Sequence, residues 1–141
     1  MPDRLTILLV EDNPDDAALT EVALRGLPAS LQVARDGQEA LDYLFNDASE
    51  LPRLVLLDLR LPNIDGLEVL QRIRENERTC LTPVVILTSS TAPEDIAAGY
   101  RYGANSYVCK PVDFDEFSGR IRELGPYWLA VNEPPPNNPD H

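Results

Sequence analysis

LVLLDLRLPNIDG occupies residues 54–66, where a run of large aliphatic residues gives way to charged and turn-forming ones. Such a short, continuous apolar run is typical of a strand buried on both faces of a parallel sheet. Asp58 follows the run, and a carboxylate there is costly unless a cation, a hydrogen bond or water meets it. Because open α/β sheets bind ligands outside the carboxyl ends of their strands, Asp58 is the first candidate for the chemistry of this chain. The alternative is a solvated aspartate that merely ends a strand.

The rest of the chain repeats this arrangement on both sides of residues 54–66. Apolar runs predict further strands at residues 5–10 and 83–88, an apolar–polar alternation predicts a short half-buried strand at 31–34, and the last strand is predicted at 106–109. Capping residues followed by apolar residues at helical spacing predict five helices. The helix starts are marked by Asn13, Asp36, Asp65, Pro93 and Asp113. Strands that alternate with helices in this way favour a doubly wound α/β fold, in which helices cover both faces of a parallel sheet.

The length of 141 residues is enough for one domain with a buried core. We expect this domain to span residues 1–131. Its final helix should be extended or kinked near Gly125–Pro126, because the residue before a proline avoids helical backbone angles. The last ten residues, 132–141, hold four of the 13 prolines and no apolar face. They predict a disordered, proline-rich tail.

The net charge of −12, from 12 basic and 24 acidic side chains, makes the surface strongly acidic. It argues against binding to nucleic acid or to anionic membranes. Cys80 and Cys109 fit no disulfide framework and no metal-binding spacing, which favours reduced, structural thiols. The N-terminal residues form no apolar signal region, and no run reaches the length of a membrane span. We therefore expect a cytoplasmic protein.

Polar residues collect at the ends of four predicted strands, and they are Glu11, Asp12, Asp58, Thr88 and Lys110. Taken singly, each has an ordinary explanation, such as a helix cap or a solvated strand end. Clustered carboxylates, however, repel one another unless a divalent cation neutralises them, and Mg²⁺ suits a site with one or two carboxylates and several waters. Lys110 and the hydroxyl of Thr88 could hold the oxygens of a phosphoryl group. The pattern therefore predicts a Mg²⁺ site that forms an aspartyl phosphate.

From residue 5 to residue 124, the sequence resembles the receiver domain of two-component response regulators. Five motifs carry the resemblance, each at the end of a predicted strand: LVEDN at 9–13, LDL at 57–59, LPNIDG at 61–66, LTS at 87–89 and KP at 110–111. The resemblance implies a flavodoxin-like fold, with a five-stranded sheet in the order 2-1-3-4-5.

The resemblance also implies roles for single residues. In the family pattern Asp58 is the phosphoacceptor, while Lys110 and Thr88 contact the phosphoryl group. The implied Mg²⁺ site consists of Asp12, Asp58, the backbone carbonyl of Arg60 and, through a water molecule, Glu11.

Two conformational features follow from the same resemblance. Thr88 and Tyr107 match the pair of residues that switch position when a receiver domain is phosphorylated. The Lys110–Pro111 peptide bond is expected to be cis, as receiver domains resemble one another in using this bond to aim the lysine. An X–Pro bond makes the cis form accessible at a cost of about 0.5–1 kcal/mol.

A narrower resemblance is to the single-domain response regulators that partner phytochrome-type histidine kinases. It rests on NPDDA at 13–17, EALDYL at 39–44, KPVDFDEF at 110–117 and YWL at 127–129. It implies that a sensor histidine kinase, such as a bacteriophytochrome, donates the phosphoryl group, and that the output runs through protein–protein contacts.

Three other functions compete with this one. A Mg²⁺-dependent phosphohydrolase with an aspartate nucleophile should carry a second aspartate two residues later as the general acid, but Arg60 stands there and cannot donate a proton at neutral pH. A dinucleotide-binding domain should have a glycine-rich first turn, whereas Glu11 and Asp12 would repel a pyrophosphate. A phosphorylation-independent adaptor would not need the residues of phosphoryl chemistry, and all of them are present. We expect no enzyme beyond a protein that assists its own phosphorylation and dephosphorylation.

The final helix predicts a homodimer. Phe114, Phe117, Ile121, Leu124 and Trp128 are spaced as in a heptad seam. The core of one domain can absorb the first four, but YWLAV at 127–131 is harder to bury. We expect this segment to pair symmetrically between two copies of the chain; the alternative is that Trp128 docks on the kinase.

Overall fold

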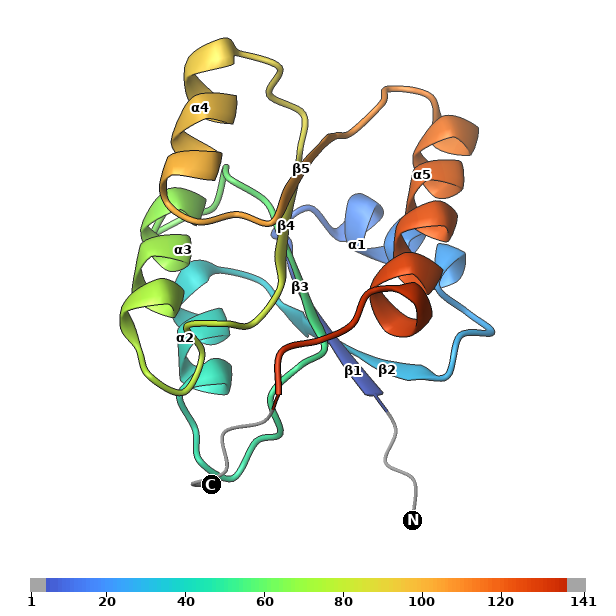
Figure 1. Ribbon diagram of the computed structural model, residues 1–141. Coiled ribbons are helices and arrows are strands. Elements are labelled where there is room, and N and C mark those ends of the chain that lie inside the picture. The colour runs from blue at the N-terminus through green and yellow to red at the C-terminus, as the bar shows by residue number, and fades with distance from the viewer. Residues whose placement is uncertain (1–4, 137–141) are drawn as a thin grey trace.

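The computed structural model describes residues 5–136 and contains one sheet of five parallel strands (Figure 1). The strands are β1 (Leu5–Val10), β2 (Ala29–Ala34), β3 (Leu54–Leu57), β4 (Val84–Thr88) and β5 (Ser106–Cys109), in the order β2-β1-β3-β4-β5. The helices are α1 (Pro14–Ala23), α2 (Gly37–Leu44), α3 (Gly66–Glu75), α4 (Pro93–Arg101) and α5 (Phe114–Pro126), which continues into the π-helix η1 (Tyr127–Val131). In Figure 1, α1 and α5 lie on one face of the sheet, and α2, α3 and α4 lie on the other. The predicted fold class and strand order are confirmed.

Short-range hydrogen bonds start four of the helices where the capping residues predict. The side chain of Asn13 accepts hydrogen bonds from the backbone N–H groups of residues 15 and 16 at the start of α1. Asp36, Asp65 and Asp113 cap α2, α3 and α5 in the same way. Helix α4 has no side-chain cap and begins at Pro93, whose missing N–H is not needed in a first turn. These bonds join residues two or three apart, which is why the sequence alone could place them.

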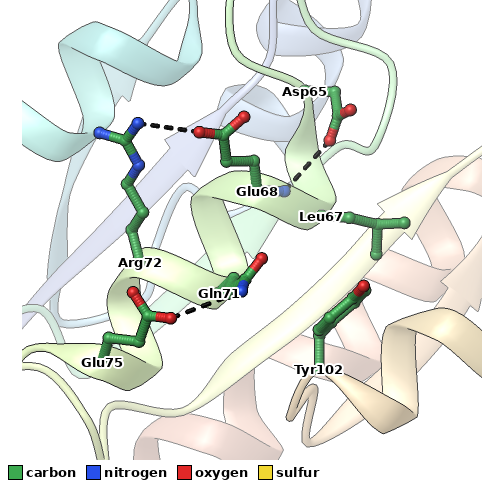
Figure 2. A pocket seen from close by; sticks show the side chains of 7 residues that line it. All are labelled: Asp65, Leu67, Glu68, Gln71, Arg72, Glu75 and Tyr102. Atoms are coloured by element: carbon green, nitrogen blue, oxygen red, sulfur yellow. Dashed lines mark hydrogen bonds and ion pairs between the residues drawn. The ribbon is translucent and has the colours of Figure 1, made fainter.

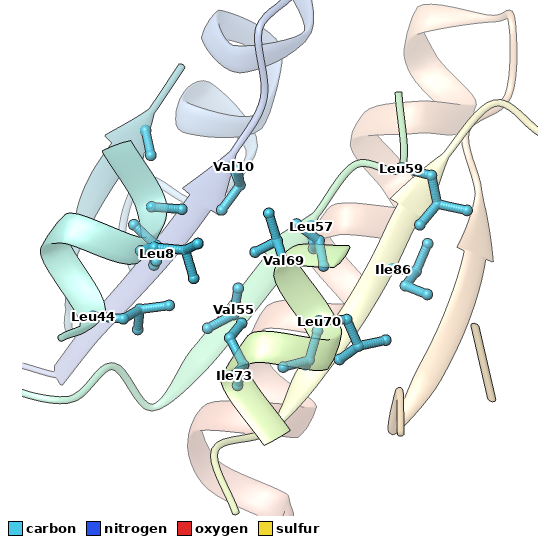
Figure 3. Close-up of a cluster of buried hydrophobic side chains, with 14 residues drawn as sticks. Leu8, Val10, Leu44, Val55, Leu57, Leu59, Val69, Leu70, Ile73 and Ile86 are labelled. Carbon is cyan, nitrogen blue, oxygen red and sulfur yellow. The ribbon is translucent and has the colours of Figure 1, made fainter. Parts of the chain in front are cut away.

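Two hydrophobic layers form the core, one on each face of the sheet. Successive residues of a strand point to opposite faces, so Leu8 and Val10 enter the layer under α2 and α3, whereas Ile7 and Leu9 enter the layer under α1 and α5. Figure 3 shows the first of these layers, where β1, β3 and β4 meet α2 and α3. Because both of their faces are covered, the central strands β3 and β4 are apolar at nearly every position, whereas the edge strand β2 carries Ser30 and Gln32.

The final helix continues past Gly125–Pro126, since α5 includes both residues and changes into a π-helix directly after them. An extended helix is one of the two forms that the sequence predicts at this point. Gly125 lies close to α1: a Cβ atom there would lie 2.9 Å from Leu24 Cδ2 and 2.7 Å from Leu27 Cδ1, so these two side chains would have to move.

The burial of individual side chains in this helix differs from the prediction. Phe114, expected in the core, is 68 % exposed, because it opens α5 at the sheet's carboxyl edge. Leu129 is buried and Trp128 packs half-buried against the same layer as Phe117 and Ile121. The domain therefore buries part of the segment that was expected to need a second copy.

The Lys110–Pro111 bond is trans, since residues 5–136 contain no cis peptide bond. The predicted cis bond is wrong for this structure. The backbone N–H of Lys110 donates to the carbonyl oxygen of Thr88 at 2.7 Å, which extends the β4–β5 ladder by one residue. This hydrogen bond directs the lysine to the edge of the sheet without a change of peptide geometry, and trans is the lower-energy form of an X–Pro bond.

Other features of the described chain agree with the composition. Cys80 and Cys109 are free and half-buried. Within residues 5–136, no helix combines the length and apolar character needed to cross a membrane. Residues 132–136 form no helix or strand, and residues 137–141 lie outside the described residues, so the disordered tail stays a prediction.

Candidate functional site

The predicted site residues meet at the carboxyl ends of β1, β3, β4 and β5. Val10 and Leu57 are paired across β1 and β3, and the N–H of Asp58 donates to the carbonyl of Val10 at 3.1 Å. The residues that follow these strands, Glu11 and Asp58, are therefore neighbours. Strand order explains this meeting, because β1 lies in the sheet directly beside β3.

Three carboxylates form a group that could share a metal ion. Glu11, Asp12 and Asp58 each present one oxygen within 4.8 Å of the other two. Glu11 and Asp58 are buried, whereas Asp12 is exposed. Oxygen ligands of this kind suit a hard divalent cation such as Mg²⁺, so the donor set fits the predicted metal.

The Lys110 ammonium lies among the acidic side chains. Its Nζ donates to Glu11 Oε1 at 2.6 Å, Asp16 Oδ2 at 2.9 Å and Asp58 Oδ2 at 3.2 Å. The side chain is only 8 % exposed, so solvent screens these ion pairs little. Lys110 thus faces the predicted phosphoacceptor directly. The sequence analysis did not include Asp16 among the site residues.

Burial and the neighbouring charges shift the pKa values of Glu11 and Lys110. Desolvation, with a smaller contribution from the charge of Asp58, raises the pKa of Glu11 to about 7, although its hydrogen bond to Lys110 opposes the shift. Desolvation alone would lower the pKa of Lys110, but hydrogen bonds to Glu11 and Asp16 and the charge of Asp58 raise it above its ordinary value. The lysine is therefore charged across the physiological range, and Glu11 can hold a proton near neutral pH.

Thr88 ends β4 with its hydroxyl unpaired. Its Oγ1 is buried, and it has no hydrogen-bond partner among the described residues. A buried hydroxyl without a partner is rare, since it loses its bonds to water without replacement. Thr88 therefore has a free donor at the same edge of the sheet as Asp58.

Tyr107 is already turned toward the loop between β4 and α4. Its hydroxyl donates to the backbone carbonyl of Ser90 at 3.0 Å. Gly99 of α4 allows this close approach, because a Cβ atom there would lie 3.2 Å from the tyrosine ring and 2.7 Å from Ile86 Cδ1. The Ser90 hydroxyl donates to Asp95 at 2.5 Å, which also ties this loop to α4. The Tyr107 ring thus touches the loop that carries the residues after Thr88.

An open groove of about 400 Å³ lies away from this cluster, between α3 and Tyr102 (Figure 2). Its polar side chains are engaged with one another along α3. Arg72 pairs with Glu68 at 2.8 Å, and Gln71 donates to Glu75 at 3.4 Å. Figure 2 shows these pairs lying along the helix surface.

The sequence of residues 7–122 matches the family of response regulator receiver domains. The chain belongs to this family. Among curated relatives of this receiver domain, the probable methanogenesis regulatory protein FilR2 of Methanothrix harundinacea is 44 % identical over 138 residues, which cover 94 % of this chain and 89 % of FilR2. The chain spans about half (51 %) of the response regulator ArlR of Staphylococcus saprophyticus, at 37 % identity over 84 % of this chain.

Solved structures of single-domain regulators have the same fold. The phosphorylated cyanobacterial phytochrome response regulator RcpA superposes with a TM-score of 0.90 at 33 % identity, covering 95 % of this receiver domain and 100 % of that chain. The Mn²⁺-bound form of response regulator Rcp1 gives a TM-score of 0.88 at 33 % identity, covering 94 % and 99 %. The bacteriophytochrome response regulator AtBRR gives 0.72 at 46 % identity, covering 94 % and 100 %.

Proposed function

We propose that this receiver domain accepts a phosphoryl group on Asp58 from a sensor histidine kinase and signals through protein–protein contacts. The observation that carries the proposal is the placement of Asp58 between the Lys110 ammonium, 3.2 Å away, and the acidic group that it forms with Glu11 and Asp12. A nucleophilic carboxylate needs an adjacent cation to meet the charge of the incoming group. The phosphohydrolase alternative lacks support, because residue 60 is an arginine whose side chain is 72 % exposed.

The transfer forms one bond and breaks one. A carboxylate oxygen of Asp58 attacks phosphorus while the phosphorus–nitrogen bond of the kinase's phosphohistidine breaks, and the imidazole leaves with the electron pair. Lys110 holds one phosphoryl oxygen, and the unpaired hydroxyl of Thr88 donates to another. Asp12, Asp58, the backbone carbonyl of Arg60 and, through water, Glu11 would hold Mg²⁺. When bound, this ion neutralises charge on the phosphoryl oxygens.

A small phosphodonor tests this function without a kinase. Incubation with acetyl phosphate and Mg²⁺ should add one phosphoryl group to the protein, and intact mass should detect it. Omission of Mg²⁺ or addition of a chelator should prevent the addition, because the phosphoryl oxygens would then face uncompensated carboxylates. A protein that stays unmodified at saturating donor and Mg²⁺ would rule out the receiver chemistry.

We infer that the donor is a phytochrome-type kinase. The support is the likeness to RcpA and AtBRR, which are described as phytochrome response regulators, over almost the whole chain. Phosphotransfer profiling against the histidine kinases of the same cell tests this inference. A faster transfer from a kinase without a phytochrome sensor would assign another donor.

The metal site should respond to pH through Glu11. Because its pKa is raised to about 7, Glu11 holds a proton in the metal-free protein at lower pH, and Mg²⁺ must displace it. We expect the apparent affinity for Mg²⁺ to fall roughly tenfold per pH unit below 7 and to level off above it. Calorimetric titration between pH 5.5 and 8.5 measures this slope. Glu11→Gln should remove most of it, and an equally steep slope in that variant would assign the proton elsewhere.

The conformational switch is proposed to couple Thr88 to Tyr107. When Thr88 donates to the phosphoryl group, the following loop, whose Ser90 carbonyl accepts the Tyr107 hydroxyl, should shift. In a protein with labelled tyrosine rings, beryllofluoride should change the Tyr107 signals of the wild type but not those of Thr88→Ala. Ser89→Ala, which removes an exposed hydroxyl next to Thr88, is the control and should behave as the wild type. Equal changes in all three proteins would contradict the coupling.

A homodimer through the final helix remains our proposal for the assembly. Its support is the exposed face of η1, where Tyr127 and Val131 are 46 % and 70 % exposed. Trp128 gives less support, because it is partly buried against the core of its own domain. We expect Tyr127→Ala combined with Val131→Ala to weaken the dimer at least tenfold, as loss of two apolar interface residues would. Sedimentation measures this change, with Val22→Ala, an exposed residue of α1, as the control. A wild-type monomer at micromolar concentration, phosphorylated or not, would exclude the dimer.

A further inference from the structure

Lys110 is the only lysine in the 141 residues, so the other eleven of the 12 basic side chains are arginines. An ammonium has three N–H donors, and Lys110 has three carboxylate acceptors within 3.2 Å, from Glu11, Asp16 and Asp58. All three donors are therefore occupied. Two of these acceptors, Glu11 and Asp58, belong to the group that could share a metal ion, and the third does not.

Asp16 differs from the other two acceptors in its position. It lies in the first turn of α1, where its N–H donates to Asn13 Oδ1 at 3.1 Å and its carbonyl accepts the Thr20 hydroxyl at 2.8 Å. The backbone of Asp16 is thus held by the helix start, and its Oδ2 reaches Lys110 at 2.9 Å. Its side chain is 26 % exposed, between the buried cluster and solvent.

A bound divalent cation would reduce the negative charge that is available to the Lys110 ammonium. When the charges of Glu11 and Asp58 are shared with a metal ion, they compensate the charge of the Lys110 ammonium less. The metal ion and the ammonium are then two neighbouring cations, and they repel each other. Asp16 is outside the metal group, so its charge stays available to Lys110. We propose that Asp16 is the dedicated counter-ion of Lys110, a positioning residue that keeps the ammonium beside Asp58 when the metal is bound. This inference rests on the proposed function for the metal, and it goes beyond that function by adding a residue to the site.

The presence of a single lysine makes the test site-specific. Protein labelled with ¹³C at the lysine ε-carbon gives one side-chain signal, and inequivalent ε-protons report an ammonium held in one place. We expect this inequivalence in the wild type with and without Mg²⁺. Asp16→Asn should retain it without Mg²⁺, when Glu11 and Asp58 still hold the lysine, and should lose it with Mg²⁺.

Asp15→Asn is the matched control, because Asp15 lies in the same helical turn, carries the same charge and is exposed. By calorimetry, Asp16→Asn should weaken Mg²⁺ binding by about tenfold, as expected for a lost hydrogen bond between charged groups, whereas Asp15→Asn should weaken it by less than about twofold. At saturating Mg²⁺, Asp16→Asn should lower the maximal rate of phosphorylation by acetyl phosphate more than the apparent donor affinity. Asp16→Glu, which keeps the charge, should restore part of this loss.

Two results would overturn the inference. One is an ordered Lys110 signal in Mg²⁺-bound Asp16→Asn. The other is an equal loss of Mg²⁺ affinity in the two aspartate variants, which would show a general effect of charge. A failure of the proposed function gives a different result, because the wild type itself would then remain unphosphorylated. The Lys110 signals of the wild type and the variants could still be compared in that case. Circular dichroism melting of each variant checks that the fold is intact.

Discussion

Replacement of Asp58 by asparagine is expected to abolish phosphorylation, with a loss of at least about 100-fold in labelling rate. Asparagine occupies the same volume, but its neutral amide cannot supply the nucleophilic carboxylate oxygen. In the structure, Asp58 presents Oδ2 to Lys110 at 3.2 Å and Oδ1 to the N–H of Arg60 at 3.2 Å, so both oxygens are oriented at the mouth of β3. Intact mass after incubation with acetyl phosphate and Mg²⁺ measures the effect.

The variant should lose this chemistry without losing its fold. The charge of Asp58 helps to raise the pKa of Glu11, so removing it relieves repulsion between the two carboxylates. We therefore expect Asp58→Asn to be at least as stable as the wild type in the absence of Mg²⁺. Asp65→Asn is the control, because Asp65 caps α3 in the following loop and asparagine caps a helix equally well. A phosphorylated Asp58→Asn protein, under conditions that label the wild type, would move the phosphoacceptor to another residue.

Replacement of Lys110 by methionine is expected to slow phosphorylation by roughly 100- to 1000-fold, the usual effect of removing one group that stabilises charge in a transition state. Methionine keeps much of the side-chain length but no charge. Lys110 Nζ is the ammonium that faces Asp58 in the strand-end cluster, and the chain has no second lysine. Rapid-quench measurement with acetyl phosphate at saturating Mg²⁺ gives the rate.

Stability provides a second measurement on the same variant. Without Lys110, three acidic side chains lose their shared partner, and breaking a buried ion pair typically costs about 3–5 kcal/mol of unfolding free energy. We expect a loss near the lower end at pH 8 without Mg²⁺, and recovery when Mg²⁺ is added. Arg120→Met is the control, because Arg120 is an exposed cation that donates to the carbonyl of Cys109, directly before Lys110. A labelling rate within threefold of the wild type would remove Lys110 from the mechanism.

The sequence by itself determined most of the secondary structure, and it pointed to most of the residues that the structure brings together in the candidate site. Asn13, Asp36, Asp65 and Asp113 start their helices through hydrogen bonds to residues two or three positions away. Such bonds depend on the local backbone alone, so a short stretch of sequence contains the information. The central strands β3 and β4 could be recognised because both of their faces are covered, which favours apolar residues at nearly every position.

The tertiary structure decided which distant groups meet. Asp15 and Asp16 are equivalent as charges in the first turn of α1, but only the second contacts Lys110, 94 positions away in the sequence. That choice depends on how α1 is rotated against the sheet, and the rotation is set by core contacts that no local pattern contains. The same reason applies to the end of the chain. The spacing from Phe114 to Trp128 indicated one apolar seam, yet the core covers Phe117 and Ile121 fully, covers Trp128 in part and leaves Phe114 exposed, because the sheet ends before the helix begins.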